Sequence, residues 1–143
     1  MIWLDDDGCS IDIAQWGQDA GARRSDQEHW HLGTRAGDFV YVAGMRGIDP
    51  RTNTLVEGDQ ARIRQGFLNM QLVAESEGAC LRDCVRIVVY VTDMSRFRPV
   101  VNTIQEELWG EGPYPPRTII EVRRLNQDDI FEVEGTFYAP MKK

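Results

Sequence analysis

The chain has 143 residues, of which 42% are apolar and 27% charged, so it fits one globular domain and is neither disordered nor of low complexity. Its apolar runs are shorter than the roughly 18 residues that a membrane span needs, and its start lacks the basic-then-apolar order of a signal peptide. The formal net charge of -7, without a basic stripe, opposes nucleic-acid binding. We therefore expect a cytoplasmic protein with no nucleic-acid or membrane partner.

The negative charge is concentrated near the N-terminus. Residues 1–28 carry seven acidic residues against two arginines, whereas the other 115 residues carry 16 acidic and 14 basic ones. This segment has no sustained helix or strand period but is too apolar for a solvated tail. We therefore expect an acidic N-terminal arm at 1–28, packed on a neighbouring subunit, and a single domain at 29–143.

The three cysteines are Cys9, Cys80 and Cys84. An odd and small number of cysteines argues against the disulfide framework of a secreted domain and favours a reducing compartment. Cys80 and Cys84 lack the second ligand pair that a structural zinc site needs. We expect both to be ordinary buried thiols and expect no metal site.

Two strands and a helix are predicted in the first half of the domain. Segments 30–34 and 38–45 have strand composition, and Gly37 between them supplies hairpin turn chemistry. A helix face then follows at spacings of four, three and four residues: Ile63, Phe67, Met70 and Ala74. We expect this helix to begin near Asp59 as N-cap and to end at Gly78, since glycine readily adopts the left-handed cap conformation.

The second half predicts one strand, one helix and two closing strands. Segment 85–91 is rich in β-branched residues, which is typical of a buried strand. The next helix begins after Asp93 or Ser95, either of which can cap it, and ends at Gly110. The closing strands are expected at 118–124 and 130–138, joined by a polar turn at 126–129.

This order, β-β-α-β-α-β-β, predicts an α+β domain. Both helices are expected to cover one face of a single mixed sheet. The other face then needs a partner, and self-association is the usual way to bury it.

Arg117 is the first candidate functional residue. It follows two prolines at the start of a strand, and its planar fork of donors suits a carboxylate. A second interpretation is a surface ion pair with Glu132 or Glu134 across the closing hairpin. Strand alternation places these two glutamates on the face opposite Phe131 and Val133.

Three motifs carry a resemblance to a known family. They are Gly-Asp-Phe-Val-Tyr-Val-Ala-Gly at 37–44 with Ile-Asp-Pro at 48–50; Val-Thr-Asp-Met at 91–94 with Phe97 and Asn102; and Pro-Pro-Arg at 115–117 with Leu125 and Phe-Glu-Val at 131–133. The last of these is the most specific. On these motifs, segment 38–139 resembles the Rid (YjgF-type) family of reactive-intermediate imine and enamine deaminases.

The resemblance implies a chorismate-mutase-like fold assembled as a homotrimer, with a barrel-like core and active clefts between subunits. It also implies a hydrolase acting on C–N bonds without metal or cofactor. Its members convert the imine or enamine of a carboxylic acid, such as 2-aminoacrylate, to the 2-oxo acid and ammonia. A small imine acid and other copies of the chain are therefore the expected partners.

The resemblance also assigns roles to residues. Arg117 would bind the substrate carboxylate, and Glu132 would position or deprotonate the attacking water or carry a proton to the leaving amine. The other implied substrate-binding positions are Trp30, Ala43, Gly44, Asn102 and Ile119.

Three of these positions depart from the family pattern. Trp30 replaces a tyrosine, Ala43 a serine and Ile119 a frequently reactive cysteine, so the pocket loses polar contacts. One hypothesis is a larger enamine such as 2-aminomuconate, with Arg35 and Arg46 near its distal carboxylate. The alternative function is a non-catalytic trimer that binds small carboxylates. RNA cleavage, known among relatives, is opposed by the negative charge.

Overall fold

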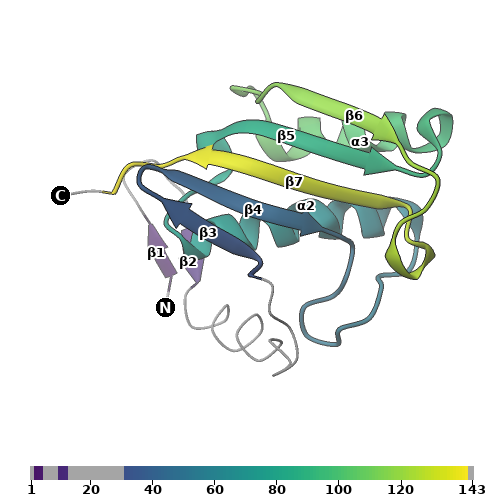
Figure 1. Cartoon of the computed structure of the whole chain (residues 1–143), viewed down its shortest axis with the longest axis horizontal. Coiled ribbons are helices and arrows are strands. Elements are labelled where there is room, and N and C mark those ends of the chain that lie inside the picture. Colours follow the sequence, from purple (N-terminus) through teal and green to yellow (C-terminus); the bar gives the residue numbers. More distant parts are fainter. Residues whose placement is uncertain (1, 5–9, 13–30, 142–143) are drawn as a thin grey trace.

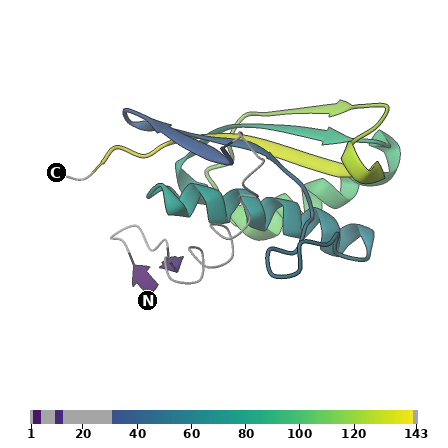
Figure 2. The same ribbon diagram turned by 60° about the horizontal axis from the view of Figure 1, so that its bottom comes forward.

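A five-stranded mixed sheet with two helices on one face forms the body of the protein (Figures 1 and 2). The computed structural model describes residues 2–4, 10–12 and 31–141. The strands are β1 (Ile2–Leu4), β2 (Ser10–Asp12), β3 (Gly33–Ala36), β4 (Phe39–Met45), β5 (Cys84–Val91), β6 (Arg117–Glu121) and β7 (Phe131–Tyr138). The helices are α2 (Asp59–Ser76) and α3 (Met94–Trp109), and 3-10 turns lie at Leu81–Asp83 and Asn126–Asp128.

The strand order is β3-β4-β7-β5-β6, with β5 and β6 parallel and all other neighbours antiparallel. The predicted α+β class, element order and mixed sheet are confirmed. The prediction that the last two strands form a hairpin is wrong, because β5 lies between β6 and β7. The core explains this order, since β5 buries Ile87, Val89 and Val91 completely and such a strand belongs inside the sheet.

Both helices cover the same face of the sheet, as Figure 2 shows. The largest fully buried side chains between the two layers are Val40, Ile63, Phe67, Met70, Ile87, Val89, Val91, Val101, Ile104, Phe131, Val133 and Phe137. On the uncovered face, the ring of Phe39 lies against those of Tyr41 and Tyr138, and all three residues remain at least 40% exposed. Large aromatic groups in water are costly, so this face is suited to a partner.

The helix ends follow the predicted capping chemistry closely. Asp93 caps α3 by accepting a hydrogen bond from a backbone N–H of the first turn, and Gly110 follows with a φ of 58°. Beyond α2, Gly78 adopts a φ of 82°, as expected of a residue that ends a helix. The N-cap of α2 is Gly58, one residue before the predicted Asp59.

The two central cysteines differ from each other. Cys84 is a free, buried thiol, and burial raises its pKa to about 12. Cys80 is disulfide-bonded, so the expectation of a free thiol is wrong for this residue. Its place in the sequence gives no sign of this, because pairing depends on which chain segments meet in space.

Only β1 and β2 of the predicted arm are described. They pair antiparallel, with Trp3 opposite Ile11, and β2 lies beside α2. Packing of the arm on a neighbouring subunit stays a prediction. Within the ranges that the structure describes, neither helix has the length and apolar character of a membrane span.

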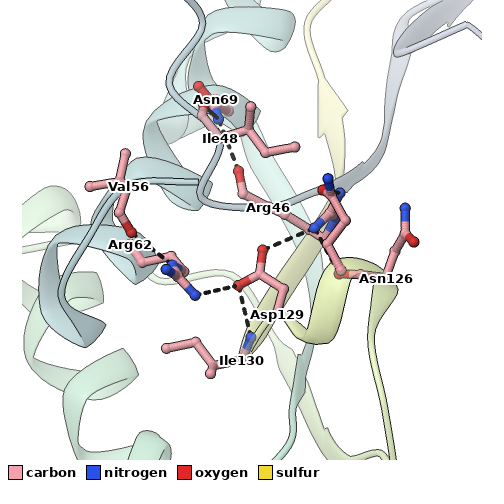
Figure 3. Close-up of polar contacts among 9 residues, drawn as sticks. Arg46, Ile48, Val56, Arg62, Asn69, Asn126, Asp129 and Ile130 are labelled. Atoms are coloured by element: carbon pink, nitrogen blue, oxygen red, sulfur yellow. Dashed lines mark hydrogen bonds and ion pairs between the residues drawn. The ribbon is translucent and has the colours of Figure 1, made fainter. Parts of the chain in front are cut away.

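A buried carboxylate joins three parts of the domain (Figure 3). Asp129, which precedes β7 and is 1% exposed, lies 3.1 Å from Arg46 after β4 and 3.7 Å from Arg62 on α2. It also accepts a hydrogen bond from the backbone N–H of Ile130, while Arg62 donates to the carbonyl of Val56. Asp129 therefore fixes the connection between β4 and α2 to the start of β7.

Replacing this carboxylate tests its structural role. Asp129→Ala leaves two mostly buried guanidinium groups without their counter-ion, and we expect the free energy of unfolding to fall by about 3–5 kcal/mol. Arg124→Ala is the control, since Arg124 and Asp128 form a pair in which both side chains are 76% exposed. This control should change stability by less than about 1 kcal/mol. Urea denaturation measures both changes. Equal losses of unfolding free energy in Asp129→Ala and Arg124→Ala would contradict the structural role of Asp129.

Candidate active site

A hollow of about 270 Å³ lies between α3 and the segment that leads into β6. Its lining residues are Asn102, Gln105, Glu106, Tyr114, Pro115 and Arg117. Amide, phenol, carboxyl and guanidinium groups line it, and its one positive group, Arg117, can attract an anion. The hollow is therefore a candidate site for a small polar ligand.

Arg117 is held at the wall of this hollow by its neighbours. It pairs in parallel register with Ile87, whose side chain is buried under the helices, so Arg117 extends to the same face. Its Nη1 donates a 2.9 Å hydrogen bond to Oε1 of Gln105, a residue only 6% exposed. Burial lowers the pKa of Arg117, and the positive charge of Arg98 lowers it further.

No carboxylate among the described residues forms an ion pair with Arg117. A half-buried guanidinium with an amide partner but no counter-ion favours binding of an external anion. Its planar donors suit a carboxylate in particular. We call Asn102, Gln105 and Arg117 the arginine half-site.

Glu132 lies on the other face of the sheet. It is opposite Tyr90 in the β5–β7 register and alternates with the buried Phe131 and Val133. A Cβ built on Gly44 would come within 2.7 Å of the Glu132 Cδ atom, so the carboxylate rests directly on the Gly44 backbone. We call Ala43, Gly44 and Glu132 the glutamate half-site.

The surroundings of Glu132 favour its protonated form. Burial raises its pKa, the positive charge of Arg46 opposes this, and the negative charges of Glu134 and Asp129 raise the pKa further. Tyr90 donates a 2.5 Å hydrogen bond to Glu134, which raises the pKa of Tyr90 to about 12. A carboxyl group that releases its proton closer to neutral pH is suited to proton transfer.

The two half-sites do not meet within one chain. Arg117 and Glu132 face opposite sides of the sheet, and β5 separates their strands by roughly 10 Å at ordinary strand spacing. The interpretation of Arg117 as an ion-pair partner of Glu132 or Glu134 is therefore wrong. A site that uses both residues needs a second copy of the chain.

The remaining candidates fall into three groups. Asn102 lines the hollow, and Ile119 packs against the core on the same face as Arg117. Ala43 is exposed beside Gly44 on the uncovered face. Trp30 lies outside the described residues.

Sequence reasoning missed Gln105. It is a buried polar residue on α3, four positions after the buried Val101, so the apolar stripe of this helix already contained the signal. A glutamine in such a stripe needs a hydrogen-bond partner, and Arg117 is that partner.

Arg35 and Arg46 do not line the hollow. Arg35 donates to the backbone carbonyls of Glu77 and Ala139, and Arg46 binds Asp129. Both guanidinium groups thus hold the fold together. The expected pairing of these arginines with a distal substrate carboxylate has no support from this placement.

Comparison with known proteins supplies the family. A family model described as Endoribonuclease L-PSP matches residues 23–139. The chain belongs to this family. It is the Rid (YjgF-type) family that the C-terminal motif indicates, and its sheet and helices match those of solved members.

Three relatives illustrate the similarity. A RutC family protein of Pyrococcus horikoshii is 36% identical over 105 residues, which cover 73% of this chain and 82% of that protein. A protein of Dermatophagoides farinae, named 2-iminobutanoate/2-iminopropanoate deaminase, is 32% identical over 104 residues, 71% of this chain and 78% of that one. The structure of a probable translation initiation inhibitor from Rhodopseudomonas palustris is 52% identical, covers 82% of this chain and 91% of that chain, and superposes with a TM-score of 0.79.

The family thus includes imine deaminases alongside members named only for their family. Among the described residues of this Rid protein, no group of three histidine, cysteine, aspartate or glutamate side chains is placed to hold a metal ion.

The raised pKa of Glu132 predicts how stability depends on pH. The folded state binds this proton more tightly than the unfolded chain, so stability falls as pH rises from the unfolded value of 4.5 through the higher folded value. Glu132→Gln, which mimics the protonated form, should therefore be at least as stable as the wild type at pH 7. Urea denaturation between pH 4 and pH 8 tests this, with the exposed Glu57→Gln as control. A clear loss of stability in Glu132→Gln alone at pH 7 would contradict the assignment.

Proposed function

We propose that this Rid protein is a cofactor-independent deaminase that hydrolyses the imine or enamine of a carboxylic acid to a 2-oxo acid and ammonia. The observation that carries the proposal is the half-buried Arg117, which Gln105 fixes at the wall of a small hollow and which forms no ion pair with any described residue. The motif that contains it and the deaminase names of relatives support the same function.

The reaction needs few groups. Arg117 binds the carboxylate, and water adds to the carbon of the protonated imine to give a carbinolamine. Glu132 accepts a proton from this water and delivers it to the nitrogen of the carbinolamine. As the C–N bond breaks and ammonia leaves, the deprotonated Glu132 takes the proton of the remaining hydroxyl group, so the C=O bond forms, and this proton then passes to ammonia. Because a protonated imine is already electrophilic, orientation and one carboxylate suffice.

The site is proposed to form between two copies of the chain in a homotrimer. The uncovered face of the sheet carries Glu132 together with the exposed aromatic residues Phe39, Tyr41 and Tyr138. A ring of copies joined head to tail through this face brings the glutamate half-site of one copy to the arginine half-site of the next. The trimeric number comes from the family resemblance.

The substrate is proposed to be a small imino acid with an apolar side chain. Ile119, two residues after Arg117 on the same face of β6, is a partly buried apolar residue, and relatives are named for 2-iminobutanoate and 2-iminopropanoate. The second candidate, the larger 2-aminomuconate, loses support because Arg35 and Arg46 are both engaged in the fold.

A second candidate function is a trimer that binds small carboxylates without turnover. Ala43 and Ile119 favour it, since neither side chain can donate a hydrogen bond to a substrate. This function keeps Arg117 as the ligand-binding group but gives Glu132 no role.

Ammonia release separates the two functions. The substrates are imines generated in the assay from alanine and 2-aminobutanoate by an amino-acid oxidase, and 2-aminomuconate. Arg117→Ala should lower kcat/KM about 10- to 100-fold because a charged hydrogen bond is lost, whereas Glu132→Gln should lower kcat and spare binding. Arg124→Ala is the control and should match the wild type.

If none of the substrates were turned over, the proposed deaminase function would be contradicted. If acetate or pyruvate then raised the melting temperature of the wild type but not of Arg117→Ala, the binding function would replace it.

A further inference from the structure

The end of β4 contains a bulge that shapes the glutamate half-site. Val42 pairs with Gly135 and Met45 with Val133, so two residues of β4, Ala43 and Gly44, face one residue of β7. Such a bulge bends a strand and changes where its neighbours point. Here it places the Gly44 backbone against the Glu132 carboxylate.

Arg46 holds the chain just beyond this bulge (Figure 3). Its Nη1 donates to Asp129 at 3.1 Å and to the carbonyl of Asn126 at 2.9 Å, and its Nη2 donates to Gln127 at 2.9 Å. Its own carbonyl accepts a 2.9 Å hydrogen bond from Asn69 on α2. The Arg46 side chain is only 11% exposed, so both its backbone and its charge are fixed.

The same arginine lies close enough to Glu132 to act on it. Arg46 directly follows Met45 and Glu132 directly precedes Val133, so both residues adjoin the last pair of the β4–β7 ladder. The charged groups that act on Glu132 among the described residues are Arg46, Glu134 and Asp129, and only Arg46 is positive.

We propose that Arg46 is the positioning residue of the glutamate half-site: anchored by Asp129, it fixes the bulged end of β4 against β7 and keeps one positive charge beside Glu132. This inference rests on the proposed function for its effect on turnover, but its structural part stands on the contacts alone. It assigns a role to the buried ion pairs beyond stability.

The expected consequence is a change in the proton affinity of Glu132. Without Arg46, the negative charges of Glu134 and Asp129 act unopposed, and the carboxyl group keeps its proton to higher pH. A general base that is protonated at the working pH is inactive, so the acid limb of the rate profile moves to higher pH.

The test compares Arg46→Met with Arg46→Lys, which restores the charge. The pKa of Glu132 is measured by carbon NMR of glutamate-labelled full-length protein, and the resonance is assigned by its loss in Glu132→Gln. We expect Arg46→Met to raise the pKa of Glu132 by about one unit, and we expect the pKa in Arg46→Lys to lie close to that of the wild type. The control Arg64→Met removes the pair of Arg64 with Glu107, where the side chains are 36% and 48% exposed, and should leave the pKa unchanged.

The pH profile of kcat/KM is the second readout. Its acid limb should move with the NMR pKa in Arg46→Met and return in Arg46→Lys. A folded Arg46→Met protein with an unchanged Glu132 pKa would overturn the proposal, as would a uniform loss of rate without movement of the limb. Arg46→Gln, which keeps a hydrogen-bond donor, serves if Arg46→Met does not fold. A wild type without turnover would refute the proposed function, while the NMR titration still decides the role of Arg46.

Discussion

The insertion of β5 between β6 and β7 is the constraint on which the rest of the site depends. It sends Arg117 toward the helices, because this residue shares its register with the buried Ile87. It leaves Glu132 on the open face, opposite Tyr90. In the proposed site, one chain therefore supplies only half of the groups at each of two places, and self-association is part of the proposed chemistry rather than an addition to it.

Each half-site is built around a buried polar residue. Gln105 under α3 aims the guanidinium of Arg117, and Asp129 beside α2 anchors Arg46 at the end of the β4 bulge. Buried polar groups are costly unless they are paired, so each one restricts its partner to a narrow set of positions. The same interactions that hold the domain together thus set the geometry of the groups that could meet a substrate.

The sequence predicts the elements well and their arrangement less well. Helix ends at Asp93 and Gly78 follow from local capping chemistry, and the buried strand β5 follows from its β-branched residues. The polar turn after β6 looks locally like a hairpin, but burial of β5 decides the strand order, and that is a tertiary effect. The signature motif names Arg117 and Glu132, whereas the partners Gln105 and Asp129 emerge only from packing.

The most direct test of a shared site is subunit mixing. Arg117→Ala and Glu132→Gln chains, each of low activity alone, are unfolded, mixed in equal amounts and refolded together, and ammonia release is compared with that of the wild type. The proposed site takes Arg117 from one copy and Glu132 from the next. In a random mixture of equal amounts, about one site in four has both residues intact, so about a quarter of the wild-type rate should return. No recovery in mixed oligomers of normal size would contradict the account.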